Sequence, residues 1–234
     1  MTQAGPLHWH TGAGWLVLGG GGNWKTGETG AIDTAALGWA SLDQPIAVLL
    51  TAGGSSADGE ALLDYFAELG GPSGYILPIH SPADAQRTEN CQLLAEAGLV
   101  YISDGPDLLG LMRSLRESPA LTALSYAFDD GAAIVGMGAG ATALGAWGID
   151  QDIADQAEPG WGWLPGAIVE PYFAGTESSN RLRGLLNAHP DCLGLGIPTG
   201  VALALGPDSR VETVGEGQVT VVLGKVDHKS ENDL

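Results

Sequence analysis

Residues 132–145 read AAIVGMGAGATALG, which is the most informative stretch of the sequence. The apolar run Ala132–Val135 is typical of a buried strand, and the small residues from Gly136 to Gly140 turn the chain into a helix. Glycine and alanine allow a backbone to turn this sharply while it packs against its neighbours. The free N–H groups at the start of such a helix attract an anion or an oxyanion. The stretch therefore predicts a strand, a tight elbow and a helix through about Trp147.

Apolar runs of strand length alternate with helical patterns before this elbow. The predicted strands are Trp15–Leu18, Pro45–Leu50, Tyr75–Ile79 and Leu99–Ile102, and the predicted helices are Thr34–Ser41, Ala57–Leu69, Ala83–Ala97, Pro106–Leu115 and Pro119–Phe128. After the elbow, short strands are predicted at Ala167–Glu170, Leu193–Ile197, Val201–Leu205, Val211–Val214 and Val219–Leu223. Continuous apolar strands with helices between them indicate a mostly parallel sheet covered on both faces.

We therefore predict an α/β three-layer sandwich with a mostly parallel central sheet and an antiparallel C-terminal extension. A turn at residues 206–209 predicts a hairpin within that extension. No linker divides the chain, so residues 1–224 are expected to form a single domain. The polar residues 225–234 are expected to be a flexible tail.

Composition excludes several classes of function. The 234 residues carry 9 Lys plus Arg against 28 Asp plus Glu, which gives a formal net charge of −19. Binding to nucleic acid or to an anionic membrane surface needs clustered basic residues, so neither partner is expected. The uncharged run 132–149 has about the length of a membrane span, but glycines interrupt it. With two cysteines and no secretory signal pattern, we expect a cytoplasmic protein.

The elbow alone leaves its ligand open. Gly138, Gly140 and Ala143 fit a loose dinucleotide-binding fingerprint, but no acidic residue closes a strand about 20 residues later. A tight structural elbow without a ligand is the other simple interpretation. His8 and His10 have the spacing of a metal pair, yet no third ligand is apparent. We therefore predict no metal and no cofactor.

Six segments, in order along the chain, carry a resemblance to a known family. They are LGGG at residues 18–21, ISDGPDL at 102–108, GMGAGA at 136–141, GWLPG at 162–166 followed by EPYF at 170–173, RL at 181–182, and GLGIPT at 194–199 followed by VAL at 201–203. The pattern resembles the cyanophycinase and dipeptidase E family of serine peptidases, whose corresponding segments include F-T-G-G-D-Q, G-T-S-A-G-A, D-x-H-F and G-I-D-E. The resemblance implies a fold like that of class I glutamine amidotransferases and a possible homodimer.

The catalytic triad that the resemblance implies is absent from the matching positions. Gly138 stands where the family has its nucleophilic serine, Tyr172 where it has the histidine base, and Thr199 where it has the orienting glutamate. Pro106 and Asp107 also replace a polar pair. Loss of a whole triad costs on the order of 10⁶ in turnover in a serine protease. No catalytic residue is expected.

What remains is a cleft with its elbow intact. We predict that the ligand-binding residues are Gly20, Gly21, Gly105, Asp107, Gly138, Ala139, Glu170 and Tyr172. The leading hypothesis is a non-catalytic homologue that binds a peptide, a small ligand or a protein through this cleft. The alternatives are a hydrolase that cleaves short Asp-containing peptides with an unconventional nucleophile, and a structural subunit of a larger assembly.

Overall fold

The computed structural model describes residues 6–149 and 157–224. Its central sheet has the strand order β11-β10-β1-β5-β4-β2-β3. The parallel strands are β1 (Trp15–Gly19), β2 (Ile46–Leu49), β3 (Gly74–Leu77), β4 (Leu99–Ile102) and β5 (Ala133–Met137). The hairpin of β10 (Ala202–Leu205) and β11 (Val211–Val214) joins β1 in antiparallel fashion. The predicted tail at 225–234 lies outside the described residues.

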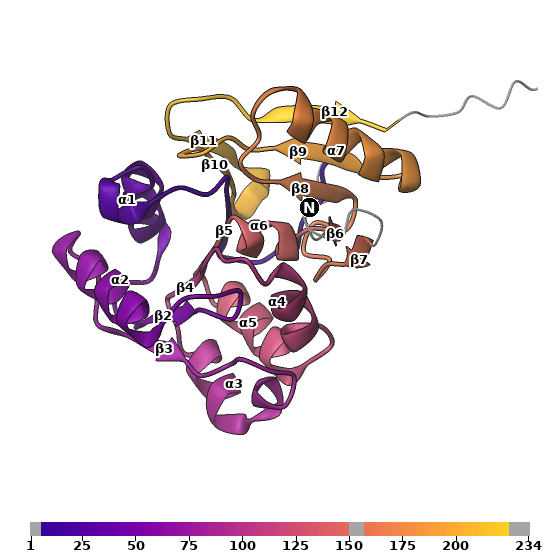
Figure 1. The fold of residues 1–234 in the computed structure, drawn as a ribbon. Helices are drawn as coiled ribbons and strands as arrows, with labels where there is room; N and C mark the ends of the chain where they lie inside the picture. Colours follow the sequence, from indigo (N-terminus) through magenta and orange to yellow (C-terminus); the bar gives the residue numbers. More distant parts are fainter. Residues whose placement is uncertain (1–5, 150–156, 225–234) are drawn as a thin grey trace, which may run out of the picture.

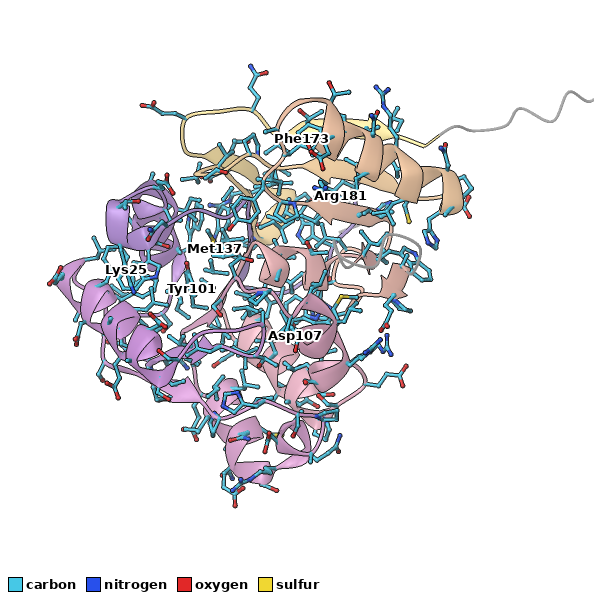
Figure 2. The ribbon with its side chains drawn as sticks, in the orientation of Figure 1. Lys25, Tyr101, Asp107, Met137, Phe173 and Arg181 are labelled. Carbon is cyan, nitrogen blue, oxygen red and sulfur yellow. The ribbon has the colours of Figure 1, made fainter. Side chains whose placement is uncertain are left out.

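Helices cover both faces of this sheet (Figure 1). On one face lie α1 (Gly30–Trp39) and α2 (Ser56–Glu68), and on the other lie α3 (Thr88–Ala95), α4 (Leu108–Leu115) and α5 (Pro119–Asp129). Alternate strand residues point to opposite faces. Val17 thus belongs to the apolar cluster that contains Phe66 of α2, whereas Leu18 belongs to the cluster that contains Phe128 of α5. Figure 2 shows Tyr101 and Met137 on the side that faces α1 and α2.

The predicted α/β class, the mostly parallel sheet and the antiparallel extension are confirmed, but one part of the topology was predicted wrongly. The strands β8 (Ala167–Glu170), β9 (Leu193–Gly196) and β12 (Thr220–Leu223) form a separate sheet, in which β8 and β9 run parallel. A helix missing from the prediction, α7 (Gly175–Ala188), covers it. This helix was missed because it is mostly polar and buries few apolar side chains, chiefly Leu182, Leu185 and Leu186.

The helix after the elbow is shorter than predicted. It is α6 (Ala139–Leu144), and Gly145 then takes an extended conformation. The following residues form β6 (Trp147–Ile149), which pairs with β7 (Ala157–Pro159). Across the described ranges 6–149 and 157–224, no helix combines the length and apolar character needed to cross a membrane.

The close approach of β5 to α6 gives a first prediction. A Cβ atom added at Gly136 would lie 2.7 Å from the backbone carbonyl of Gly140, so Gly136→Ala must push the helix away from the strand. We expect this variant to lose about 2 kcal/mol of unfolding free energy, as overpacked cores do. Urea denaturation followed by tryptophan fluorescence measures the loss.

A matched glycine serves as the control. Gly38 lies in α1 with no atom within 4 Å of an added Cβ. Alanine has the higher helix propensity, so Gly38→Ala is expected to gain about 0.5 kcal/mol. Equal stability of the two variants would contradict the tight contact between β5 and α6.

Candidate functional site

The elbow places Gly138 between β5 and α6 in a conformation that favours glycine. Its φ is 51° and its ψ is −111°, and its N–H donates to the carbonyl of Gly19 at the end of β1. A residue with a side chain is strained at such a positive φ, at a cost of about 1–3 kcal/mol. The backbone thus has the sharp strand-to-helix turn that the sequence predicted, with no side chain at its tip.

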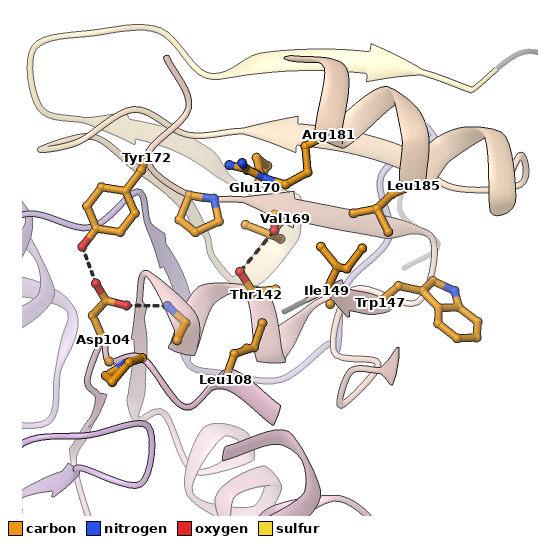
Figure 3. A pocket seen from close by; sticks show the side chains of 15 residues that line it. Asp104, Leu108, Thr142, Trp147, Ile149, Val169, Glu170, Tyr172, Arg181 and Leu185 are labelled. Atoms are coloured by element: carbon orange, nitrogen blue, oxygen red, sulfur yellow. Dashed lines mark hydrogen bonds and ion pairs between the residues drawn. The ribbon is translucent and has the colours of Figure 1, made fainter. Parts of the chain in front are cut away.

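Asp104 fills the space beside this tip. A Cβ atom added at Gly138 would lie 2.1 Å from Asp104 Oδ1 and 2.2 Å from its Cγ. The N–H of Ala139, the first residue of α6, donates to Asp104 Oδ1 at 2.8 Å (Figure 3). In a serine hydrolase with this kind of elbow, the N–H after the nucleophile stabilises the oxyanion of the reaction. Here a carboxylate of the chain itself occupies both positions.

Tyr172 holds the other oxygen of this carboxylate. Its hydroxyl donates to Asp104 Oδ2, and its backbone N–H donates to the carbonyl of Gly20 at 2.8 Å. The ring packs where a Cβ at Gly21 would lie, 2.2 Å from the ring Cζ. Burial, reinforced by the hydrogen bond to Asp104, raises the pKa of Tyr172 above its usual range. The phenol therefore stays protonated and acts as a donor rather than as a base.

A second polar group is the ion pair of Glu170 and Arg181. Glu170, at the end of β8, is only 5% exposed, and Arg181 Nε on α7 lies 2.7 Å from its Oε1. The second guanidinium nitrogen, Nη2, donates to the same oxygen. Burial raises the pKa of Glu170, and the hydrogen bonds from Arg181 oppose that shift. The guanidinium of Arg181 thus balances the charge of the buried Glu170 carboxylate.

These groups line one cavity of about 280 Å³, which we call the Glu170 cavity. Asp104 and Tyr172 lie at one end of it, and Trp147 and Leu185 lie at the other (Figure 3). The remaining lining residues are Gly105, Pro106, Leu108, Ala139, Thr142, Gly148, Ile149, Val169, Glu170, Pro171 and Arg181. Thr142 has a structural role, because its hydroxyl donates a hydrogen bond to the carbonyl of Val169 at 3.2 Å. The cavity combines apolar walls with a few polar groups, as small-molecule sites do.

The structure brings part of the predicted set to this cavity. Gly105, Ala139, Glu170 and Tyr172 line it. Gly20 and Gly21 instead pack against Pro198 and Tyr172, and Gly138 lies behind the carboxylate of Asp104. Asp107 accepts a hydrogen bond from the N–H of Gly110 and caps α4, and Thr199 lies beside Gly22. Ligand binding by the predicted residues stays a prediction.

The sequence reasoning missed Asp104. The signal was present, because Asp104 stands where the pattern F-T-G-G-D-Q has its first glycine. A carboxylate at a position where the pattern has glycine needs more space, so its presence indicates a change in a neighbouring residue. Gly138 and Asp104 are 34 residues apart in the sequence. Their contact becomes visible only from the parallel pairing of β4 with β5, in which Ile102 lies opposite Gly136.

The model of a protein family described as peptidase family S51 matches residues 17–212. The chain belongs to peptidase family S51. The cyanophycinases of Synechococcus elongatus and Thermosynechococcus vestitus are each 30% identical to it over 237 aligned residues, which cover 95% of this chain and 73% of the relative. The cyanophycinase of Geminocystis herdmanii is 24% identical over 176 residues, covering 71% of this chain and 64% of that relative.

A solved structure agrees with the S51 fold. It is a peptidase from an acI-B1 actinobacterium, which superposes with a TM-score of 0.75 at 20% identity and covers 93% of each chain. At this identity the likeness concerns the fold. The family thus confirms the resemblance, whereas the catalytic state of the elbow depends on the residues of this chain.

The Glu170–Arg181 pair gives a prediction with a defined pH dependence. Arg181→Met leaves a buried carboxyl without its cation and should cost about 3 kcal/mol of unfolding free energy. Burial alone then holds the pKa of Glu170 above its unfolded value of about 4.3. Ionisation of such a carboxyl destabilises the folded state as the pH rises above the unfolded pKa of about 4.3. The loss of unfolding free energy in Arg181→Met should therefore be larger at pH 8 than at pH 5.

Urea denaturation at both pH values measures this loss. The exposed Arg183, two residues further along α7, gives the control variant Arg183→Met, for which a change within about 0.5 kcal/mol is expected. The double variant Glu170→Gln/Arg181→Met should recover most of the stability. A loss that is the same at pH 5 and pH 8 would refute the role given to Glu170.

Proposed function

We propose that this S51 chain is a non-catalytic homologue of the serine peptidases, which binds a peptide or a small ligand through the Glu170 cavity. One observation carries the proposal: the Asp104 carboxylate stands where the side chain of a nucleophile at residue 138 would project. Acyl transfer needs a nucleophile, a base that takes its proton and donors for the oxyanion. Gly138 supplies no nucleophile, Tyr172 is no base, and the N–H of Ala139 already binds a carboxylate.

Binding needs none of these catalytic groups. The Glu170 cavity keeps a buried ion pair, a phenol, a carboxylate and an apolar wall within about 280 Å³, which suits a ligand of dipeptide size. The first probe is a dipeptide of aspartate and arginine joined through the β-carboxyl group, whose charged groups suit a cavity lined by Glu170, Arg181 and Asp104. The alternative, a hydrolase with an unconventional nucleophile, is tested by the activity measurement below, because turnover by the wild type would require such a nucleophile.

The activity test uses the purified full chain and four substrates or controls: an Asp-Xaa dipeptide, an isoaspartyl dipeptide, the β-Asp-Arg dipeptide and a reaction without protein. We expect no turnover by the wild type. The triple variant Gly138→Ser/Tyr172→His/Thr199→Glu should also be inactive, because the Asp104 carboxylate overlaps the new side chain at position 138. Adding Asp104→Gly to that triple variant should restore measurable hydrolysis.

The binding test measures the thermal midpoint of the wild type with each of the three peptides, β-Asp-Arg first, at millimolar concentration. A ligand at 100 times its Kd stabilises a fold by about 2.7 kcal/mol, so a shift of several degrees is expected. The variant Leu108→Trp, which fills the cavity, should lose the shift. Turnover by the wild type above the protein-free rate would overturn the non-catalytic assignment, and a flat midpoint with all three peptides would overturn peptide binding.

A further inference from the structure

A second cavity of about 340 Å³ lies on the other side of Asp104, which among the described residues is the one that lines both cavities. We call it the Ser103 cavity. It opens at the carboxyl ends of β1, β2, β4 and β5, on the face of the sheet that carries α1 and α2. Figure 2 places Lys25, Tyr101 and Met137 there, away from Arg181. Open α/β sheets bind ligands at this edge.

The body of the Ser103 cavity is apolar and aromatic. Leu50, Leu62 and Met137 are buried side chains of its wall, and Tyr101 is 4% exposed. The half-buried indole of Trp24 completes the rim. A ligand that fills this space therefore gains by burying a compact apolar group, at about 25 cal/mol for each Å² removed from water.

Two polar groups of this cavity can form further hydrogen bonds. Within the part of the chain that the structure describes, Ser103 Oγ is buried without a hydrogen-bond partner. An unsatisfied hydroxyl costs about 1–3 kcal/mol, which an apolar residue at position 103 would avoid. Beside it, the carboxylate of Asp104 is held by two neutral donors, the N–H of Ala139 and the hydroxyl of Tyr172. A carboxylate accepts about four hydrogen bonds, so it can still bind a cationic donor.

The rim already binds an ammonium group of the chain itself. Lys25 Nζ lies 3.0 Å from Asp58 Oδ1 and 5.2 Å from the centroid of the Trp24 ring. Both contacts are typical of an ammonium ion, an ion pair and a cation–π interaction. Asp58 and Asp104 give the cavity two carboxylates against one lysine. Together with the net charge of −19, this balance repels anions and attracts a further cation.

We infer that the Ser103 cavity binds an organic ammonium ion with a compact apolar body. The ammonium group would bind the Asp104 carboxylate and Ser103 Oγ, and the apolar body would pack on Leu62 and Tyr101. The site shares only Asp104 with the Glu170 cavity among the described lining residues, and the inference does not depend on the proposed function. Each of the two assignments can therefore fail without the other.

The test titrates the full chain, labelled with nitrogen-15, with 2-phenylethylammonium chloride and follows the amide shifts by NMR. We expect saturable shifts at residues 22–25, 53–58 and 103. The neutral isostere 2-phenylethanol should bind at least tenfold more weakly, and phenylacetate should not bind. Shifts confined to residues 147–149 and 170–185 would place the ligand in the Glu170 cavity and overturn the inference, as would binding of phenylacetate with equal affinity or the absence of saturable binding.

Two variants probe the site from opposite directions. Lys25→Met removes the competing ammonium group from an exposed position, so 2-phenylethylammonium should bind at least threefold more tightly. Ser103→Leu fills the cavity without breaking a described hydrogen bond and should weaken binding at least tenfold. The control Ser179→Leu, on α7, should leave the affinity unchanged. If circular dichroism shows Ser103→Leu to be unfolded, Lys25→Met decides, and unchanged or weaker binding by that variant overturns the inference.

Discussion

The carboxylate of Asp104 joins three parts of this structure through hydrogen bonds. It accepts a hydrogen bond from the N–H of Ala139 on α6 and another from the hydroxyl of Tyr172 after β8. These contacts tie the central sheet, the elbow and the second sheet to one side chain. Hydrogen bonds to a charged acceptor are roughly twice as strong as neutral ones. The same contacts explain the glycine at position 138, where any side chain would meet the carboxylate.

Tyr172 depends on the same constraint. It is a non-glycine residue with a φ of 52°, a conformation that costs free energy and persists where the surroundings fix it. Its N–H is bound to Gly20, its ring rests against Gly21, and its hydroxyl is bound to Asp104. Tyr172 thus keeps a strained backbone geometry while its hydroxyl acts as a hydrogen-bond donor.

Much of the fold could be predicted because its signals are local. Strands such as β2 and β4 are continuous apolar runs that end at turn residues, and they differ plainly from the helices between them. The second sheet could not be separated from the first in this way, since β8 and β9 are as apolar as the strands of the central sheet. For the site, the glycine at position 138 could be read from the sequence, but the proximity of Asp104 to it became visible only with the register of β4 against β5.

The position of Asp104 between two cavities has a thermodynamic consequence. A ligand that displaced this carboxylate toward one cavity would change the free energy of binding in the other, because Asp104 lines both. Such coupling is reciprocal: if occupation of the Ser103 cavity alters the affinity of the Glu170 cavity by some factor, the reverse effect has the same size.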